Sequence, residues 1–213
     1  MEDRRIRPAP VRVDPATTGA ARVGPARFGV YGKLPARGDF VRLGLPGSFV
    51  TPWDDWLAAV IAGSRAAMAE DWLPAWLKAP VWRFVLAAGS CGPEAVLGLM
   101  LPSVDRVGRY FPLTLAAVFA VGWTASADAW LDAAEALGRA ALEQDMTPEQ
   151  IVQSLPAPAV GAVAAASGAW WTEGGPLVPP QRLALSGLPD AARFAAMIGA
   201  ATVAADAATE IGA

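Results

Sequence analysis

The chain of 213 residues contains no histidine and a single cysteine, Cys91. The absence of histidine excludes Ser-His-Asp and Cys-His nucleophilic sites, histidine-ligated zinc and imidazole acid–base catalysis. A single cysteine excludes an intrachain disulfide and fits a reducing compartment. Cys91 stands in the turn-like string GSCGP with no histidine to activate its thiol, so we expect it to have no catalytic role.

Charge is sparse as well. Charged residues make up 17% of the chain and hydrophobic residues 54%, so a large buried core is available. The net charge of −3 argues against nucleic acid as a partner. The uncharged run between Arg109 and Asp128 is broken by Pro112 and Gly122, and its apolar part is shorter than the roughly 20 residues that a membrane helix needs. No apolar signal segment opens the chain, so we expect a cytoplasmic protein without membrane insertion.

Short apolar runs bounded by Gly and Pro predict the strands, and helical spacing of apolar residues predicts the helices. The expected strands cover 28–31, 81–88, 95–101, 113–121, 170–172 and 183–186. The second, third and fourth of these are expected to form an antiparallel meander. The expected helices start from an N-cap at Thr51, cover 71–78, start near Ser126, start from a capping box at Thr147, and cover 189–198. One antiparallel sheet with helices packed on it accounts for this order, so the predicted fold class is α+β.

The two ends of the chain differ from its middle. Residues 1–26 hold five arginines among Pro, Ala and Gly without periodicity, which predicts a flexible basic tail. Residues 27–199 carry all the predicted strands and helices and are expected to form one domain. The alanine-rich segment 200–213 is predicted to be frayed.

Two loops rich in Gly and Pro concentrate charge beside the predicted sheet. The first, GKLPARGDF at 32–40, lacks the phosphate-loop pattern because Leu34 follows its lysine, and Gly38 is expected to permit a tight turn there. The second, PSVDRVGRYFP at 102–112, connects two apolar strands. Arg83 lies in a predicted strand and needs an acidic partner if it points inward, for which Asp39 and Asp105 are the candidates.

Three segments together resemble a known family. They are FGVYGKLPARGDFVRLGLP, then VWRFVL with LMLPSVDRVGRYFPLTL, then GAWWT followed by GLPDAARFAAMI. In this order they are similar to the TagF family, also called ImpM, of proteins associated with bacterial type VI secretion. The resemblance extends from Phe28 to Ile198. Its GKLPARGDF and PSVDRVGRYFP strings are its most specific part.

The resemblance implies a cytoplasmic, non-enzymatic repressor that acts after translation on assembly of the secretion apparatus. It implies binding to an FHA-domain scaffold protein, alongside a threonine kinase and phosphatase pathway, and a single domain with a longin-like or profilin-like fold. Some relatives carry a fused PP2C-type phosphatase domain, for which this chain is too short. The family transfers no catalytic residue, cofactor or metal ligand to this sequence.

The first functional hypothesis is a protein-binding surface on which both charged loops converge. Arg and carboxylate groups in short loops either reach out to a partner or pair with each other and lock the loops together. Both interpretations stay open from the sequence. The candidate partner-binding residues are Lys33, Arg37, Asp39, Asp105, Arg106 and Arg109, edged by Trp171.

Two other hypotheses stay open. Asp39 and Asp105 can form an acid pair, or ligate magnesium, in an enzyme that acts on a phosphorylated substrate. A domain of sheet and helices can also hold a small molecule or a nucleotide as a sensor, although no phosphate-loop or polar-pocket signature supports that reading.

Overall fold

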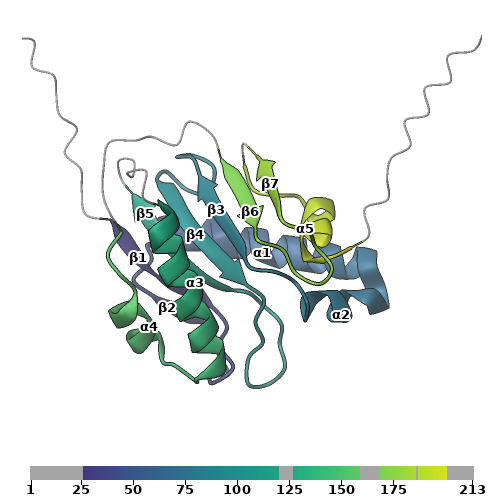
Figure 1. The fold of residues 1–213 in the computed structure, drawn as a ribbon, viewed down its shortest axis with the longest axis horizontal. Coiled ribbons are helices and arrows are strands. Elements are labelled where there is room, and N and C mark those ends of the chain that lie inside the picture. Colours follow the sequence, from purple (N-terminus) through teal and green to yellow (C-terminus); the bar gives the residue numbers. More distant parts are fainter. Residues whose placement is uncertain (1–25, 120–126, 159–167, 186, 201–213) are drawn as a thin grey trace, which may run out of the picture.

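A computed structural model describes residues 26–119, 127–158, 168–185 and 187–200. Within them, seven strands form one sheet in which every pair of neighbours is antiparallel, in the order β2-β1-β5-β4-β3-β6-β7 (Figure 1). The strands are β1 (Arg27–Gly32), β2 (Val41–Leu43), β3 (Trp82–Leu86), β4 (Ala95–Leu101), β5 (Leu113–Phe119), β6 (Ala169–Thr172) and β7 (Gln181–Ala184). The helices are α1 (Gly47–Met68), α2 (Trp72–Trp76), α3 (Ala127–Glu143), α4 (Pro148–Ser154) and α5 (Ala191–Ile198).

The predicted α+β class and the central meander of β3, β4 and β5 are confirmed. The longin-like or profilin-like comparison stays a prediction. The predicted tail over 1–26 and the predicted frayed end over 200–213 lie outside the described residues except for Ala26 and Ala200, and so does the helix start at Ser126. Within the described part of the chain, none of the helices combines the length and apolar character needed to cross a bilayer.

Helices cover both faces of the sheet (Figure 1). On one face α1, α2 and α5 enclose a core that contains Trp53, Phe84 and Trp170. On the other face α3 and α4 cover a second core that contains Leu115 and Leu131. Every residue of β4 and β5 is buried as a result, which explains why their sequences AVLGLML and LTLAAVF are almost continuously apolar rather than alternating; the polar exception, Thr114, accepts a hydrogen bond from the Trp53 indole N–H.

The first helix starts upstream of its predicted N-cap. The expectation of an N-cap at Thr51 is wrong, because α1 begins at Gly47 and Pro52 lies inside it. Phe49 and Val50, in the first turn, are buried in the core under α1. Burial of two large apolar side chains outweighs the absence of a side-chain cap at the true start. By contrast, the predicted capping box at Thr147 is confirmed at the start of α4.

Two other differences concern the strands at the edges of the sheet. The strand β2 was not predicted, because three residues are too few for an apolar pattern; it forms by pairing with β1, with Val30 opposite Leu43. The strand β7 covers 181–184 rather than the predicted 183–186. Pairing with the neighbouring strand, β1 for β2 and β6 for β7, determines where each of these strands forms.

Arg83 finds its acidic partners on α3. Its guanidinium Nη2 lies 2.8 Å from Asp132 Oδ1 and 3.0 Å from Glu135 Oε2. The prediction of Asp39 or Asp105 as its partner is therefore wrong. Alternation along β3 puts Arg83 on the face of the sheet that α3 covers, on the opposite side from Phe84.

Candidate functional site

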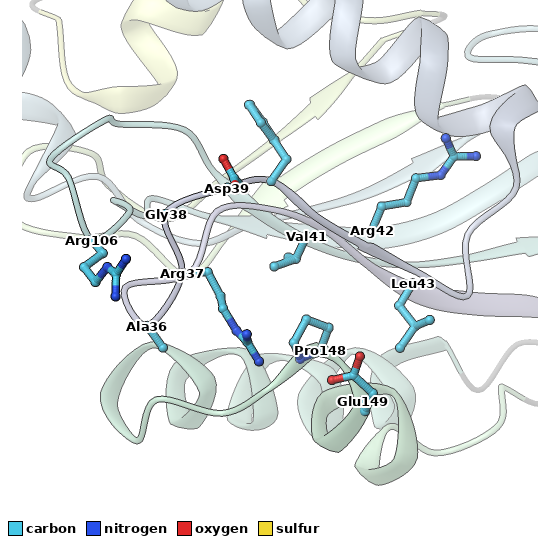
Figure 2. A pocket seen from close by; sticks show the side chains of 11 residues that line it. Ala36, Arg37, Gly38, Asp39, Val41, Arg42, Leu43, Arg106, Pro148 and Glu149 are labelled. Carbon is cyan, nitrogen blue, oxygen red and sulfur yellow. The ribbon is translucent and has the colours of Figure 1, made fainter.

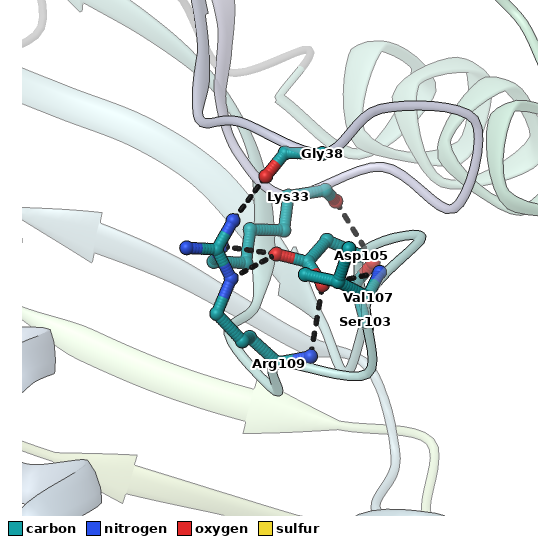
Figure 3. Close-up of polar contacts among 6 residues, drawn as sticks. All are labelled: Lys33, Gly38, Ser103, Asp105, Val107 and Arg109. Carbon is teal, nitrogen blue, oxygen red and sulfur yellow. Dashed lines mark hydrogen bonds and ion pairs between the residues drawn. The ribbon is translucent and has the colours of Figure 1, made fainter.

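The structure brings the two charged loops together at one end of the sheet. The loop between β1 and β2 contacts the loop between β4 and β5 through hydrogen bonds that involve the main chain. The N–H of Arg106 donates to the carbonyl of Arg37 at 3.0 Å, and the hydroxyl of Ser103 donates to the carbonyl of Lys33 at 2.8 Å. The guanidinium of Arg109 also donates to the carbonyl of Gly38 (Figure 3). The two loops therefore form one unit.

Asp105 is the centre of this unit (Figure 3). Its Oδ2 accepts hydrogen bonds from Lys33 Nζ at 2.5 Å and from Arg109 Nε at 2.7 Å. Its Oδ1 accepts from the backbone N–H groups of Val107 at 3.0 Å and Arg109 at 2.8 Å. Lys33 is 3% exposed and Asp105 4%, so this ion pair is buried. Three of the seven predicted binding residues are thus engaged with one another inside the chain.

The surroundings of Asp105 favour its charged form. Burial of the carboxylate acts to raise its pKa, but the hydrogen bonds from Lys33, from both groups of Arg109 and from the Val107 N–H outweigh burial. The pKa of Asp105 is therefore held well below its usual range. A carboxylate with both oxygens occupied in this way is a structural anion, and its lone pairs are not directed at solvent.

The local sequence explains why the second loop takes this shape. Asp105 and Gly108 occupy the first and last positions of a tight turn, with the Gly108 N–H donating to the Asp105 carbonyl at 3.0 Å. Asp at the first position and Gly at the last are favoured in type I turns, and the φ of +83° at Gly108 suits glycine. The Asp side chain caps the N–H two residues on, which stabilises the turn further.

A different glycine holds the first loop. Gly38 does not have the positive φ of a glycine-dependent turn, so the expectation that it permits one is wrong. Gly32, at the end of β1, has a φ of +130°, and a Cβ there would lie 2.0 Å from the carbonyl oxygen of Pro112. This close approach of β1 to the end of the second loop is what places Lys33 beside Asp105.

Three other predicted residues line an open cavity of about 450 Å³ beside the loops. Arg37, Asp39 and Arg106 border it from the loops, and Pro148 and Glu149 border it from α4. Figure 2 shows the Arg37 side chain extending toward α4. Arg37 and Arg106 are exposed, and neither has an ion-pair partner among the described residues. The Arg106 guanidinium is therefore available to a ligand, whereas the charge of Arg37 also acts on the Glu149 carboxylate that lines the same cavity.

Trp171 is not at this site. It lies on β6, which is separated from β5 by β3 and β4, and the Arg182 guanidinium lies 4.7 Å from the centre of its ring. The expectation that it edges the charged loops is not met, since the Trp-Trp strand pairs with β3 on the far side of the meander.

The sequence reasoning missed Phe40. This exposed ring lies 4.4 Å from Lys33 Nζ and packs edge-on against Phe111, with ring centres 4.8 Å apart. An aromatic residue directly after a charged Gly-rich string was the available signal. No group of three or more Cys, Asp or Glu side chains that could hold a metal ion occurs among the described residues.

Comparison with known proteins identifies the family. Residues 29–157 match the family model of the TagF N-terminal domain, described as type VI secretion system-associated. The chain belongs to the TagF family. A solved structure agrees with this: the crystal structure of PA0076 from Pseudomonas aeruginosa PAO1 superposes with a TM-score of 0.70 at 35% sequence identity, covering 80% of this chain and 93% of that one. No curated protein matches the sequence. Both charged loops lie inside the TagF match, and Trp171 lies outside it.

Cys91 offers a direct check of the β3–β4 turn. It is 3% exposed, and burial raises the pKa of its thiol to about 12. Because the thiolate is the reactive form, we expect the native protein to react with an aromatic disulfide reagent at least ~100-fold more slowly than the unfolded chain in guanidinium chloride. The release of the coloured thiol measures both rates, with Cys91→Ala as the blank. Equal rates would contradict the burial of this thiol.

Proposed function

We propose that this TagF-family protein is a non-enzymatic, cytoplasmic repressor of type VI secretion. It acts by binding another protein, the FHA-domain scaffold of the secretion system. The family membership supplies the biological setting. The geometry of the two loops supports binding at a surface that is rigid before the partner arrives.

This proposal rests on the observation that some charged residues of the two loops pair with each other while others stay exposed beside the cavity. Lys33 and Arg109 both pair with the carboxylate of Asp105 and so fix the loops, whereas Arg37 and Arg106 extend from the fixed loops beside an open cavity. Fixed loops lose little conformational entropy on binding, which favours affinity. Exposed arginines on such a surface are suited to carboxylates of a partner protein.

The engagement of Asp105 in this ion-pair network also supports a non-enzymatic role. An acid pair of Asp39 and Asp105, or a magnesium site built on them, needs carboxylate oxygens that face a substrate. Both oxygens of Asp105 are occupied by Lys33, Arg109 and the Val107 N–H. Using Asp105 in catalysis would leave the buried Lys33 without a counter-charge, which is costly.

The test is a binding measurement with the purified full chain and the FHA-domain protein of the same secretion cluster. We expect the double variant Arg37→Glu, Arg106→Glu to bind at least about tenfold more weakly than the unaltered chain, because reversed charges repel the partner's carboxylates. Isothermal titration calorimetry gives the affinity. The melting temperature of the variant is expected to stay unchanged, since both side chains are exposed.

The matched control is Arg193→Glu on α5, another exposed arginine, which is outside the two loops and their cavity. It is expected to bind like the unaltered chain. In cells, overproduction of the unaltered chain is expected to stop secretion, and overproduction of the double variant to leave it running. Lack of any complex with the FHA-domain protein would overturn the proposed partner. A complex that tolerates the charge reversal would overturn the proposed surface.

A further inference from the structure

A second hollow lies on the other side of the Asp105–Gly108 turn. It has a volume of about 470 Å³ and is bordered by Gly108 and Arg109 from the turn, by Arg65 from the end of α1, by Trp72 and Leu73 from α2, and by Tyr110. The sequence patterns did not single out this place, because its residues come from two segments far apart in the chain, 65–73 and 108–110. None of the described residues that line it is acidic. Of the two guanidinium groups at this concave surface, that of Arg109 is paired with Asp105, so Arg65 supplies the positive charge that no carboxylate among the lining residues balances.

The guanidinium of Arg65 contacts the hollow through its flat face, which lies over an aromatic ring, and not through the N–H groups at its edge. Its guanidinium carbon lies 4.1 Å from the centre of the Trp72 ring and 6.0 Å from that of Tyr110. Trp72 is itself fixed, since its indole N–H donates to the Ser64 hydroxyl at 2.9 Å. No carboxylate pairs with Arg65 among the described residues. Stacking uses the flat face of a guanidinium and leaves the N–H groups at its edge directed outward, where they can bind a carboxylate with two hydrogen bonds.

Apolar surface lies directly beside this cation. Tyr110 also borders a smaller hollow of about 160 Å³, together with Pro35, Val104 and Leu77, the last of which is 65% exposed. Leu73, in the basic hollow itself, is exposed as well. Leu73 lies on α2 and Leu77 directly follows that helix, and together with Tyr110 they form an apolar area beside the cation on which a side chain of a partner protein can pack.

We infer that the Arg65 hollow binds a glutamate or aspartate side chain of the partner protein, and that an apolar residue near that acid packs on Leu73, Leu77 and Tyr110. The partner segment is therefore acidic and amphipathic. This inference deepens the proposed function and rests on it: the partner would contact both sides of the Asp105–Gly108 turn, with Arg37 and Arg106 on one side and Arg65 on the other.

Two variants separate recognition from stability. Arg65→Lys keeps the positive charge in the last turn of α1, and with it the favourable interaction with the helix dipole, but it loses the planar donor edge. Arg65→Glu reverses the charge. We expect the FHA-domain protein to bind Arg65→Lys at least about fivefold more weakly and Arg65→Glu at least about tenfold more weakly. Arg65→Lys is expected to keep the melting temperature, because the side chain is exposed.

A second experiment tests the inference without the partner protein. Fluorescence anisotropy compares the full chain's binding of three labelled peptides that carry the same leucines beside glutamates, glutamines or phosphothreonine. We expect the glutamate peptide to bind more tightly than the glutamine peptide, and Arg65→Lys to remove the difference. Equal binding of these two peptides, or a preference that survives in Arg65→Glu, would overturn the inference. So would a phosphothreonine peptide that binds over about tenfold more tightly than the glutamate one, because it would assign the hollow to phosphorylated partners.

The two arms distinguish the possible failures. If the FHA-domain protein does not bind the unaltered chain at all, the proposed partner fails, and the peptides alone decide the inference. If that protein binds the unaltered chain and Arg65→Glu equally well, the inference fails while the proposed function stands.

Discussion

Replacing Asp105 with asparagine is expected to lower the melting temperature by roughly 10 °C at neutral pH. The substitution keeps the shape of the side chain but removes its charge, so the buried Lys33 is left without a counter-ion. The amide NH2 of asparagine also replaces one of the two carboxylate oxygens, each of which accepts two hydrogen bonds. In one orientation this NH2 faces the donors Lys33 and Arg109 Nε, and in the other it faces the backbone N–H groups of Val107 and Arg109. Differential scanning calorimetry of the purified full chain measures the change.

Asp39→Asn is the matched control. Asp39 is exposed and in the neighbouring loop, and no ion pair holds it among the described residues. Its substitution is expected to leave the melting temperature within about 1 °C of the original. If both variants melt alike, Asp105 does not hold the loops together.

The lowered pKa of Asp105 also predicts how the stability of the protein depends on pH. Because the pKa of Asp105 is lowered in the folded chain, its contribution to stability is fully present above its unfolded pKa of about 3.9 and is lost as the pH falls toward the folded value. We therefore expect the difference in melting temperature between the unaltered chain and Asp105→Asn to be largest above pH ~5 and to shrink steadily below pH ~4. A difference that stays constant down to pH ~2 would show that charge is not its origin.

Replacing Gly32 with alanine is expected to destabilise the fold by about 3 kcal/mol or more. The φ of +130° at this position is costly for any residue with a Cβ, and the added carbon would lie 2.0 Å from the Pro112 carbonyl oxygen. Relief of that clash requires β1 to move away from the end of the second loop, which carries Lys33 away from Asp105. Urea denaturation followed by tryptophan fluorescence measures the free energy of unfolding.

Gly38→Ala, six residues further along the same string, is the control. A Cβ at Gly38 meets only Arg106 Nη2, at 3.9 Å, and the backbone there has no left-handed φ. Its substitution is expected to change the free energy of unfolding by less than about 0.5 kcal/mol. Equal costs at the two glycines would mean that the approach of Gly32 to Pro112 does not hold the loops in place.

Binding gives a second readout for both structural variants. Asp105→Asn and Gly32→Ala leave the side chains of Arg37 and Arg106 unchanged, yet both loosen the loops that carry these arginines. A partner that recognises a rigid surface is expected to bind them more weakly even at temperatures where they are fully folded.

Local patterns determined most of the fold. The runs at β4 and β5 are apolar at every position except Thr114, so they predict strands buried on both faces whatever packs on them. The capping box at Thr147 and the turn from Asp105 to Gly108 depend on residues three positions apart, whose hydrogen bonds form within the segment itself. The strings GKLPARGDF and PSVDRVGRYFP likewise gave the family without any coordinates.

The tertiary structure alone decided which charges are buried and which face a partner. Asp39 and Asp105 both lie in charged loops that contain glycine; Asp105 and Gly108 predict a local turn, but no local signal shows that Asp105 is buried against a lysine while Asp39 is exposed. Asp105 is the structural anion because Lys33, 72 positions away, is brought beside it by the pairing of β1 with β5. The same holds for Arg83 and its partners on α3, and for Arg65, whose hollow joins residues 65–73 to the distant residues 108–110. Burial and charge pairing depend on what packs against a side chain, and that is fixed by long-range contacts that a local pattern does not contain.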